Sequence, residues 1–267
     1  IENVFDIKKR WKPIIANRPP LKWAGGKRWL IPYIVPIWEK HTDKRLVEPF
    51  CGGMAITLGL LPKKAWLNDV NPHLINFYKQ IKKGLKISIN FKNDSEYYYK
   101  KRDRFNQLLQ SGERNSKEAA ELFYYLNRTG FNGLCRFNLS GLFNIPFGKY
   151  KTINYSKDFY DHRKVFKNWK FTTEDFSSMK LGKNDFIYAD PPYDVPFTQY
   201  SMGGFSWEDQ VRTAKWGAKH PGAVVLCNQA TDRIVKLYES LGFKIQILHA
   251  PRLISCDGKR QKVKEVL

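Results

Sequence analysis

Short apolar runs alternate with helix-length periodic segments at both ends of the chain. The periodic segments predict helices at 54–61, 206–219 and 231–241, and Ser206 before Glu208 and Asp209 is typical of a helix start. The apolar runs predict strands at residues 45–50, 65–68, 169–173, 186–189, 223–228, 243–250 and 263–267. Strands that alternate with helices indicate an α/β fold with a mostly parallel, twisted sheet and helices on both faces.

Residues 76–155 interrupt this rhythm. Helical patterns occur at 95–110 and 116–127, where lysines and arginines mingle with tyrosines. The segment 127–138 is dense in glycine and asparagine, which indicates turns. We therefore expect a main domain made of residues 1–75 and 156–267, with residues 76–155 inserted as a mainly helical subdomain that carries a β-hairpin.

The charge of the chain points to a polyanionic partner. With 267 residues the chain can form a core that carries an inserted subdomain. Its 46 lysines and arginines against 25 aspartates and glutamates give a formal net charge of +21. Contacts from these cations to DNA phosphates would make binding salt-dependent and largely independent of sequence. The alternative is that the charge serves only solubility.

Other features narrow the class of protein. No apolar stretch is long enough for a membrane span and no signal peptide pattern precedes the fold, so we expect a soluble, cytoplasmic protein without a membrane partner. The four cysteines lack metal-ligand spacing and predict reduced thiols and no metal site: Cys51, Cys135, Cys227 and Cys256.

The tetrapeptide Asp190-Pro191-Pro192-Tyr193 follows the apolar run 186–189 and carries the most specific chemistry. A strand that ends in a carboxylate places this acceptor at the carboxyl edge of a sheet, where ligands of open α/β folds bind. The prolines fix the backbone, so that the Pro191 carbonyl would lie beside the Asp190 carboxylate. These two acceptors suit the two hydrogens of an exocyclic amino group, and Tyr193 offers a ring for base stacking. The alternative is an ordinary strand-to-loop turn.

A glycine turn precedes this motif in the chain. The strand at 45–50 runs into Gly52 and Gly53, and the next strand ends at Asp69. The spacing between Gly52 and Asp69 is close to the ~20 residues expected when an acid binds ribose hydroxyls. This β-turn-α-β unit predicts a nucleotide-like ligand.

Six blocks in order resemble the Dam-type DNA N6-adenine methyltransferases, bacterial and phage enzymes of the α group and D12 class that act on GATC. The resemblance runs from about Pro20 to the end, and its blocks are residues 21–27, 47–53, 68–71, 125–138, 143–150 and 190–193. It implies a Rossmann-like, S-adenosylmethionine-dependent methyltransferase fold in which residues 76–155 are the target-recognition domain. One departure concerns the Phe-x-Gly-x-Gly turn, because Phe50-Cys51-Gly52-Gly53-Met54 has its second glycine one place early.

The resemblance also implies a binding site for S-adenosylmethionine. A lysine can meet the carboxylate of this donor, a tryptophan ring can meet its sulfonium, and an aspartate can accept from its ribose. The implied donor-binding residues are Trp23, Lys27, Asp69 and Asp190, with Phe50, Gly52 and Gly53 as the floor of the pocket. By position alone, Asp175 and Phe176 at the tip of the third strand are candidates for the adenine of the donor.

Residues of the insert resemble the family's DNA contacts. Arg136 is similar to an arginine that reads a guanine, as arginine does through O6 and N7. Leu134 and Pro146 are similar to the family's thymine-methyl contacts, and Lys22 and Tyr150 to its readers of the first guanine. Phe131, beside Asn132, is similar to the aromatic wedge that opens the base stack. Lys149 and Arg128 are similar to phosphate contacts, and Asn138 lies in the same block. The alternatives are core positions for Leu134 and Phe131 and a hairpin-capping role for Tyr150.

The predicted reaction is transfer of a methyl group to N6 of an adenine that is flipped out of duplex DNA. Direct in-line transfer needs no covalent intermediate, so the cysteines are expected to be bystanders. Two alternatives stay open: methylation of cytosine N4, and a sequence-specific DNA-binding module that has lost catalysis. We expect a monomer whose partner is double-stranded DNA at the nucleoid, with a cognate restriction endonuclease as a second candidate partner.

Overall fold

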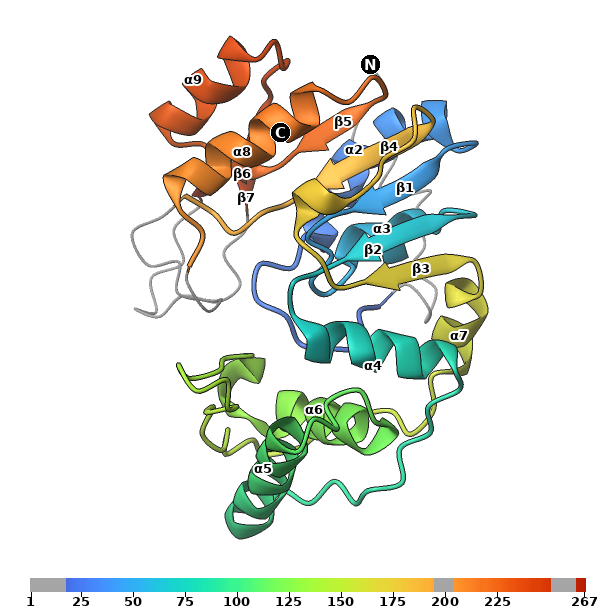
Figure 1. Ribbon diagram of the computed structural model, residues 1–267, viewed down its shortest axis with the longest axis vertical. Coiled ribbons are helices and arrows are strands. Elements are labelled where there is room, and N and C mark those ends of the chain that lie inside the picture. The colour runs from blue at the N-terminus through green and yellow to red at the C-terminus, as the bar shows by residue number, and fades with distance from the viewer. Residues whose placement is uncertain (1–17, 195–203, 251–262) are drawn as a thin grey trace.

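A five-stranded parallel sheet forms the centre of the upper lobe in Figure 1. The computed structural model describes residues 18–194, 204–250 and 263–267. The strand order is β3 (Trp169–Thr172), β2 (Ala65–Asn68), β1 (Arg45–Glu48), β4 (Asp185–Ala189) and β5 (Val224–Leu226). The chain winds outward from β1 to β3 and then returns to β4 on the other side of β1. The junction of β1 and β4 is therefore the topological switch point, where open α/β sheets bind their ligands.

Alternate residues of the central strands enter two separate hydrophobic cores. In β1, Leu46 belongs to one core and Val47 to the other; in β4, Phe186 and Ile187 divide in the same way. The first core is covered by α2 (Ile31–Trp38), α3 (Ala55–Leu60) and α4 (Pro72–Lys82), and the second by α8 (Trp207–Ala218) and α9 (Asp232–Ser240). This arrangement confirms the predicted α/β fold with helices on both faces.

A small antiparallel sheet follows the main one and corrects two predicted strands. Its order is β6 (Asn228–Gln229), β8 (Val263–Val266) and β7 (Ile247–Ala250). The predicted strand 223–228 breaks at Cys227, beyond which Asn228 and Gln229 pair with β8. The predicted strand 243–250 begins only at Ile247, because Phe243 N–H closes the end of α9 on the Tyr238 carbonyl.

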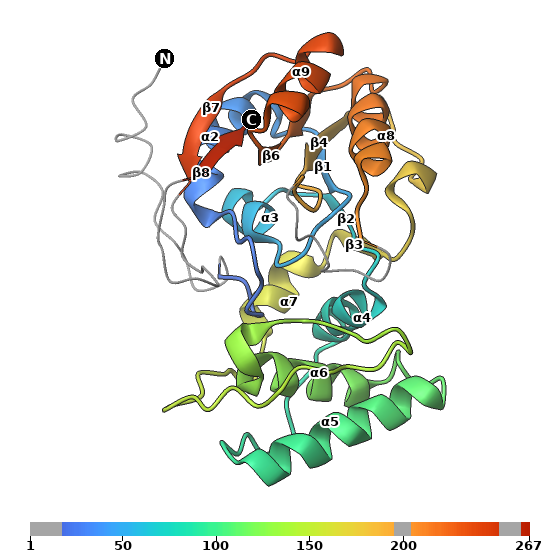
Figure 2. The same cartoon turned by 90° about the vertical axis from the view of Figure 1, so that its left-hand side faces the viewer.

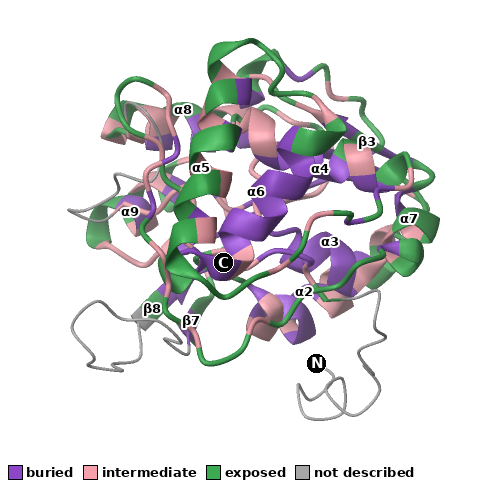
Figure 3. Ribbon diagram, turned by 90° about the horizontal axis from the view of Figure 1, so that it is seen from below, coloured by how far each residue is buried: buried purple, intermediate pink, exposed green. Residues whose placement is uncertain are grey.

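Two helices of the middle segment lie below α4 (Figure 2), and their buried side chains belong to the same hydrophobic core as those of α4. These helices are α5 (Ser95–Gln110) and α6 (Lys117–Thr129), which begin at the side-chain caps Asp94 and Ser116. Figure 3 shows α6 as a buried helix beside the exposed α5. The helix α7 (Tyr160–Phe166) then leads back to β3. Short 3-10 turns complete the described elements: η2 (Arg28–Leu30), η3 (Glu39–His41), η4 (Phe131–Gly133) and η5 (Phe176–Ser178).

The predicted hairpin of the insert is paired at only two points. Isolated antiparallel bridges join Gly130 to Phe147 and Phe137 to Phe143, and residues 130–150, all of them described, contain no regular strand. Gly141, with a φ of 73°, lies in the turn between the paired segments, and Pro146 has no N–H to donate to a ladder next to the Gly130–Phe147 bridge. In the described parts of the chain, no helix has the length and apolar character needed to cross a membrane.

Candidate active site

The glycine turn lies at the carboxyl end of β1, at the switch point of the sheet. Gly52 has a φ of +43°, and a Cβ on it would lie 2.7 Å from Trp23 Nε1, so the tryptophan ring packs directly on the turn. Met54 has φ 57° and ψ 34°, which is the left-handed conformation that glycine adopts most easily. The departure from the family's glycine pattern is therefore absorbed by Met54, and the turn is kept.

Asp69 fastens the tip of β2 to this turn. Its carboxylate accepts hydrogen bonds from Gly52 N–H at 3.0 Å and from Asn71 N–H at 2.9 Å. Burial raises the pKa of Asp69, while the two N–H donors oppose this effect. The position agrees with the prediction from the glycine spacing, and its contact with ribose stays a prediction.

Asn68, the last residue of β2, ties three strand ends together. Its buried side-chain amide donates to the carbonyls of Pro49 at 3.0 Å and Glu174 at 2.9 Å, and its oxygen accepts from Thr172 Oγ1. These bonds hold the carboxyl ends of β1, β2 and β3 at fixed spacing.

Asp190 follows β4 and forms an ion pair with Lys27. The distance between Lys27 Nζ and Asp190 Oδ2 is 3.2 Å, and the two side chains are 7% and 19% exposed. Lys27 Nζ also donates to the Gly25 carbonyl at 2.9 Å and lies 4.4 Å from the centroid of the Tyr193 ring. The structure thus brings Lys27, Asp190 and Tyr193 together, although Lys27 is more than 160 positions away in the sequence.

The second oxygen of Asp190 is buried and has no hydrogen-bond partner among the described residues. Burial raises the pKa of Asp190 to about 6, and the nearby Lys27 ammonium opposes this rise. For Lys27, burial disfavours the charged form, but Asp190, Cys227 and Glu265 together outweigh this effect and the pKa of Lys27 is raised. A buried acceptor without a donor is rare in folded proteins. Asp190 Oδ1 is therefore an acceptor that lacks a donor within the described part of the chain.

The phenol of Tyr193 is anchored by residues that the sequence did not reveal. Tyr193 Oη donates to Glu265 Oε2 at 2.7 Å and lies 3.3 Å from Cys227 Sγ. Glu265 is 7% exposed and belongs to β8. A glutamate within a predicted terminal strand gave no signal of burial. Burial raises the pKa of the Cys227 thiol well above its ordinary value, which disfavours the nucleophilic thiolate.

The backbone after Asp190 is held by a chain of buried amides. Gln210 Nε2 donates to the Pro192 carbonyl at 2.7 Å, and Asn228 Nδ2 donates to Gln210 Oε1 at 2.9 Å. Asn228 Oδ1 then accepts from the Asp194 N–H at 3.2 Å. Gln210 and Asn228 are 2% and 0% exposed. Sequence reasoning credited the prolines alone with fixing this turn and missed both amides.

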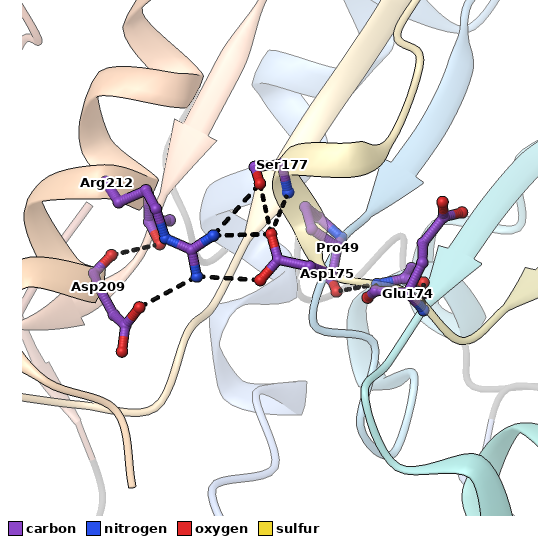
Figure 4. A network of polar contacts seen from close by, with 8 residues as sticks. Pro49, Glu174, Asp175, Ser177, Asp209 and Arg212 are labelled. Atoms are coloured by element: carbon purple, nitrogen blue, oxygen red, sulfur yellow. Dashed lines mark hydrogen bonds and ion pairs between the residues drawn. The ribbon is translucent and has the colours of Figure 1, made fainter. Parts of the chain in front are cut away.

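Of the two adenine candidates, Phe176 packs beside the glycine turn and Asp175 is paired with Arg212. Phe176 is buried, and its ring centroid is 5.2 Å from that of Phe50, next to the glycine turn. Asp175 forms a bidentate pair with Arg212 at 2.7 and 2.9 Å, and Arg212 also contacts Asp209 (Figure 4). The hydrogen bonds from Arg212 lower the pKa of Asp175 to about 2.

The structure brings together three of the predicted DNA-binding residues: Lys22, Arg128 and Tyr150. Lys22 Nζ lies 3.7 Å from the centroid of the Tyr150 ring and 3.3 Å from the Arg128 carbonyl. Burial lowers the pKa of Lys22, and Arg128 adds to this effect. Tyr150 Oη donates to the Gly130 carbonyl at 3.0 Å, so its predicted alternative as a cap of the paired loop describes a real contact.

The segment before Trp23 is tied to α6. Lys22 N–H donates to Asn127 Oδ1 at 2.9 Å, and Asn127 Nδ2 donates back to the Lys22 carbonyl at 2.8 Å. Arg128 Nη2 donates to the Pro20 carbonyl at 2.9 Å. Residues 20–22 therefore join the insert to the tryptophan that packs on the glycine turn.

The remaining DNA-binding candidates lie along the loop 131–149. Phe131 is 48% exposed, so its predicted alternative as a core residue is wrong, whereas Leu134 is half-buried against the core. Arg136 Nε donates to Asn144 Oδ1 at 2.9 Å, which orients the arginine on the loop surface. The other members of this group are all exposed: Asn132, Asn138, Pro146 and Lys149.

The fold and this site together define a class of protein. A doubly wound parallel sheet whose switch point carries a glycine turn and an Asp-Pro-Pro-Tyr turn is a Rossmann-like methyltransferase, and S-adenosylmethionine is in general the methyl donor of this class. The family model of D12 class N6 adenine-specific DNA methyltransferases matches residues 23–252. The chain belongs to this family and is an adenine-specific DNA methyltransferase.

Known proteins are similar over nearly the whole chain. A Type II methyltransferase, M.MjaIII, of Methanocaldococcus jannaschii is 33% identical and covers 92% of this chain and 95% of its own length. The DNA adenine methylase of Haemophilus influenzae is 34% identical over 97% of this chain and 96% of its own. The DNA adenine methylase of Vibrio cholerae is also 34% identical, over 94% and 95%. These names favour adenine over the cytosine alternative.

Proposed function

We propose that the protein methylates N6 of an adenine that is flipped out of duplex GATC sites, by direct in-line transfer. The observation that carries this proposal is the buried Asp190 Oδ1, which has no partner among the described residues. An exocyclic amine supplies the donor that this oxygen lacks. The Pro191 carbonyl would accept the second hydrogen of the amine.

The chain's own residues suit the methyl donor of the family. Lys27 uses two of its three N–H groups on Asp190 and Gly25, which leaves one for the carboxylate of S-adenosylmethionine. Phe50 and Phe176 form an apolar wall beside the glycine turn, and Gly52 and Gly53 let the backbone approach closely; Trp23 and Asp69 complete the proposed set. When bound, S-adenosylmethionine supplies an electrophilic methyl group.

Asp190 and Lys27 act on the adenine amine. Lys27 keeps the buried Asp190 carboxylate ionised, so that it accepts from N6 and stabilises positive charge that develops there. Accepting both hydrogens shifts the nitrogen toward tetrahedral geometry and directs its lone pair at the methyl carbon. Tyr193, anchored by Glu265, would stack on the flipped base. Positioning supplies most of the catalysis.

Replacement of Asp190 tests this role. Asp190→Ala should lower the methylation rate by at least ~10²–10³ at saturating donor, by analogy with the loss of one preorganised polar group. The rate is measured with labelled donor and unmethylated plasmid, while donor binding is followed by calorimetry. Near-normal turnover would remove Asp190 from the mechanism, and absent donor binding in the wild type would favour the inactive DNA-binding module.

The GATC specificity is tested by mapping the modified adenines in the plasmid by sequencing. Arg136→Ala should cost about 1–3 kcal/mol of discrimination at one guanine. Lys149→Ala is the matched control, because the loss of a phosphate contact weakens binding to all sequences alike. Unchanged preference in Arg136→Ala would exclude this arginine from readout.

We further propose a monomer that acts on chromosomal DNA in the cytoplasm, at the nucleoid. Because one relative is named a Type II methyltransferase, a restriction endonuclease that cuts the same site is the proposed second component of the system. Sedimentation measures the mass of the protein in solution and so tests the monomer. Resistance of the methylated plasmid to a GATC-cutting nuclease tests whether methylation protects the site from cleavage.

A further inference from the structure

Every loop that leads into a strand of the main sheet carries lysine. These loops are residues 42–44, 61–64, 167–168, 180–184 and 219–223. Because the five strands are parallel, the loops meet at the amino edge of the sheet, at the right in Figure 1. We name their lysines the amino-edge lysines: Lys44, Lys63, Lys64, Lys167, Lys180, Lys183 and Lys219.

The charge of the amino-edge lysines is almost unopposed. Asp43 is the one acid in these loops, and it lies 3.0 Å from Lys44. Asp185 at the start of β4 is buried and pairs with Arg45. The other six lysines are exposed and form no ion pair with an acidic residue that the structure describes.

Helix dipoles explain only part of this pattern. Cations are favoured at helix C-termini, and Lys167 and Lys219 are the C-cap residues of α7 and α8. Lys63 and Lys64 lie beyond Leu61, the C-cap of α3, and Lys183 follows only the short 3-10 turn η5. Clustered like charges destabilise a compact state by mutual repulsion. Helix dipoles therefore give no reason for Lys63, Lys64 and Lys183.

We propose that the amino-edge lysines bind the phosphate backbone of a second segment of duplex DNA. Five strands at about 4.8 Å spacing make a row about 19 Å long, along which duplex DNA carries about 11 negative charges. A shallow hollow of about 400 Å³ continues the row at its β3 end, and its lining residues are Lys79, Lys82, Lys167, Asn168, Trp169, Lys170 and Phe171. The sheet and its helices separate this edge from the Asp190 turn, so one straight duplex cannot contact both.

The same surface lacks the groups that other polyanions require. Membrane insertion uses exposed apolar side chains, and none of the exposed large hydrophobic residues of the described chain lies in these loops. Single strands stack on exposed aromatic rings, but Trp66 and Trp169 at the starts of β2 and β3 are buried. Phosphate contact without base reading suits duplex DNA.

A capture experiment tests the proposal. Protein is bound to an immobilised short duplex that carries its methylation site, and a fluorescent duplex without the site is added. Wild type should retain the second duplex, whereas the triple variant Lys63→Gln, Lys64→Gln, Lys183→Gln should lose at least about tenfold in affinity for it. The slope of log affinity against log salt should fall by up to about 2.7, from ~0.9 per lost contact.

The matched control removes three exposed lysines from α8, α9 and the loop after α9: Lys215→Gln, Lys236→Gln, Lys244→Gln. This variant should capture the second duplex as the wild type does, and all three proteins should methylate the short duplex at equal rates. Should the triple variant fail to fold, Lys180→Gln with Lys183→Gln replaces it. The proposal is overturned if wild type captures no second duplex, or if both triple variants lose capture equally. The proposal is also overturned if the variant Lys63→Gln, Lys64→Gln, Lys183→Gln loses binding to phosphatidylserine vesicles but captures the second duplex as the wild type does.

Discussion

At the scale of single residues, the two oxygens of Asp190 have different surroundings. Oδ2 faces Lys27 at 3.2 Å, and Oδ1 is buried without a partner among the described residues. A chemist reading Asp190-Pro191-Pro192-Tyr193 can predict the acceptor, because the motif is contiguous and follows an apolar strand. Glu265 and Gln210 were not predictable, because each lies beside other polar residues of its strand or helix and becomes part of the site only through folding.

The rate of methylation should depend on the protonation of Asp190. Burial raises the pKa of Asp190 to about 6, and the ionised form is the stronger acceptor and the one that stabilises positive charge on the amine, so kcat should fall as pH decreases through about 6. The stability contribution has the opposite sign: it is full below the pKa of the unfolded chain and is lost as pH rises through about 6. The ionised, active form is thus the less stable one.

The Lys27 ammonium sets the position of this pH profile. Lys27→Met removes the cation and should move the acid limb of kcat to higher pH, whereas Lys27→Arg keeps the charge and should leave the limb near about 6. This shift is measured from steady-state rates at saturating donor, taken between pH 5 and 9 in steps of about half a pH unit. An unmoved limb in Lys27→Met would show that another group titrates.

At the scale of elements, caps and short strands decided what was predictable. Helix α8 begins where Ser206 and Asp209 form a capping box, and this start was legible because its signal is local. The break between β5 and β6 was not predictable, since residues 223–228 were expected to form one strand and only the pairing of Asn228 and Gln229 with β8 divides it. The glycine turn combines both cases: the turn was predictable from Gly52 and Gly53, but the left-handed conformation of Met54 was not.

Gly52→Ala should weaken donor binding more than it weakens the fold. Its Cβ would meet Trp23 Nε1 at 2.7 Å, and the positive φ adds strain of about 1–2 kcal/mol. Gly112→Ala is the control, because Gly112 also has a positive φ but no atom within 4 Å of the new Cβ. We expect both variants to lose stability in urea through the strained φ, with a further loss in Gly52→Ala from the displaced Trp23, and a donor affinity at least about tenfold lower for Gly52→Ala alone, from calorimetry. Equal affinities would place Trp23 outside the donor site.

At the scale of the whole molecule, two cores on opposite faces of the sheet support the switch-point site, and a helical lobe carries the exposed loop 131–149. Alternating strands and helices predicted the sheet and its two covered faces. The second sheet and the ties between residues 20–22 and α6 were not predictable, because they join segments far apart in the sequence.

Donor binding should stabilise the entire fold. A ligand that binds only the native state at 100 times its Kd adds about 2.7 kcal/mol. For a chain of this size the expected rise in Tm is about 5–10 °C. Scanning fluorimetry with S-adenosylmethionine measures it, with Trp23→Ala as the variant that should lose most of the rise. Equal shifts in both proteins would contradict the assignment of Trp23.

The hydrogen bonds between residues 20–22 and α6 connect residues that we propose to contact DNA with the tryptophan that we propose to contact the methyl donor. If contact with cognate DNA fixes the positions of Lys22 and Arg128, it also fixes the position of Trp23 on the glycine turn. If cognate DNA raises the affinity for the donor by some factor, the donor must raise the affinity for cognate DNA by the same factor. Such an enzyme would bind its methyl donor most tightly when the cognate sequence is already bound.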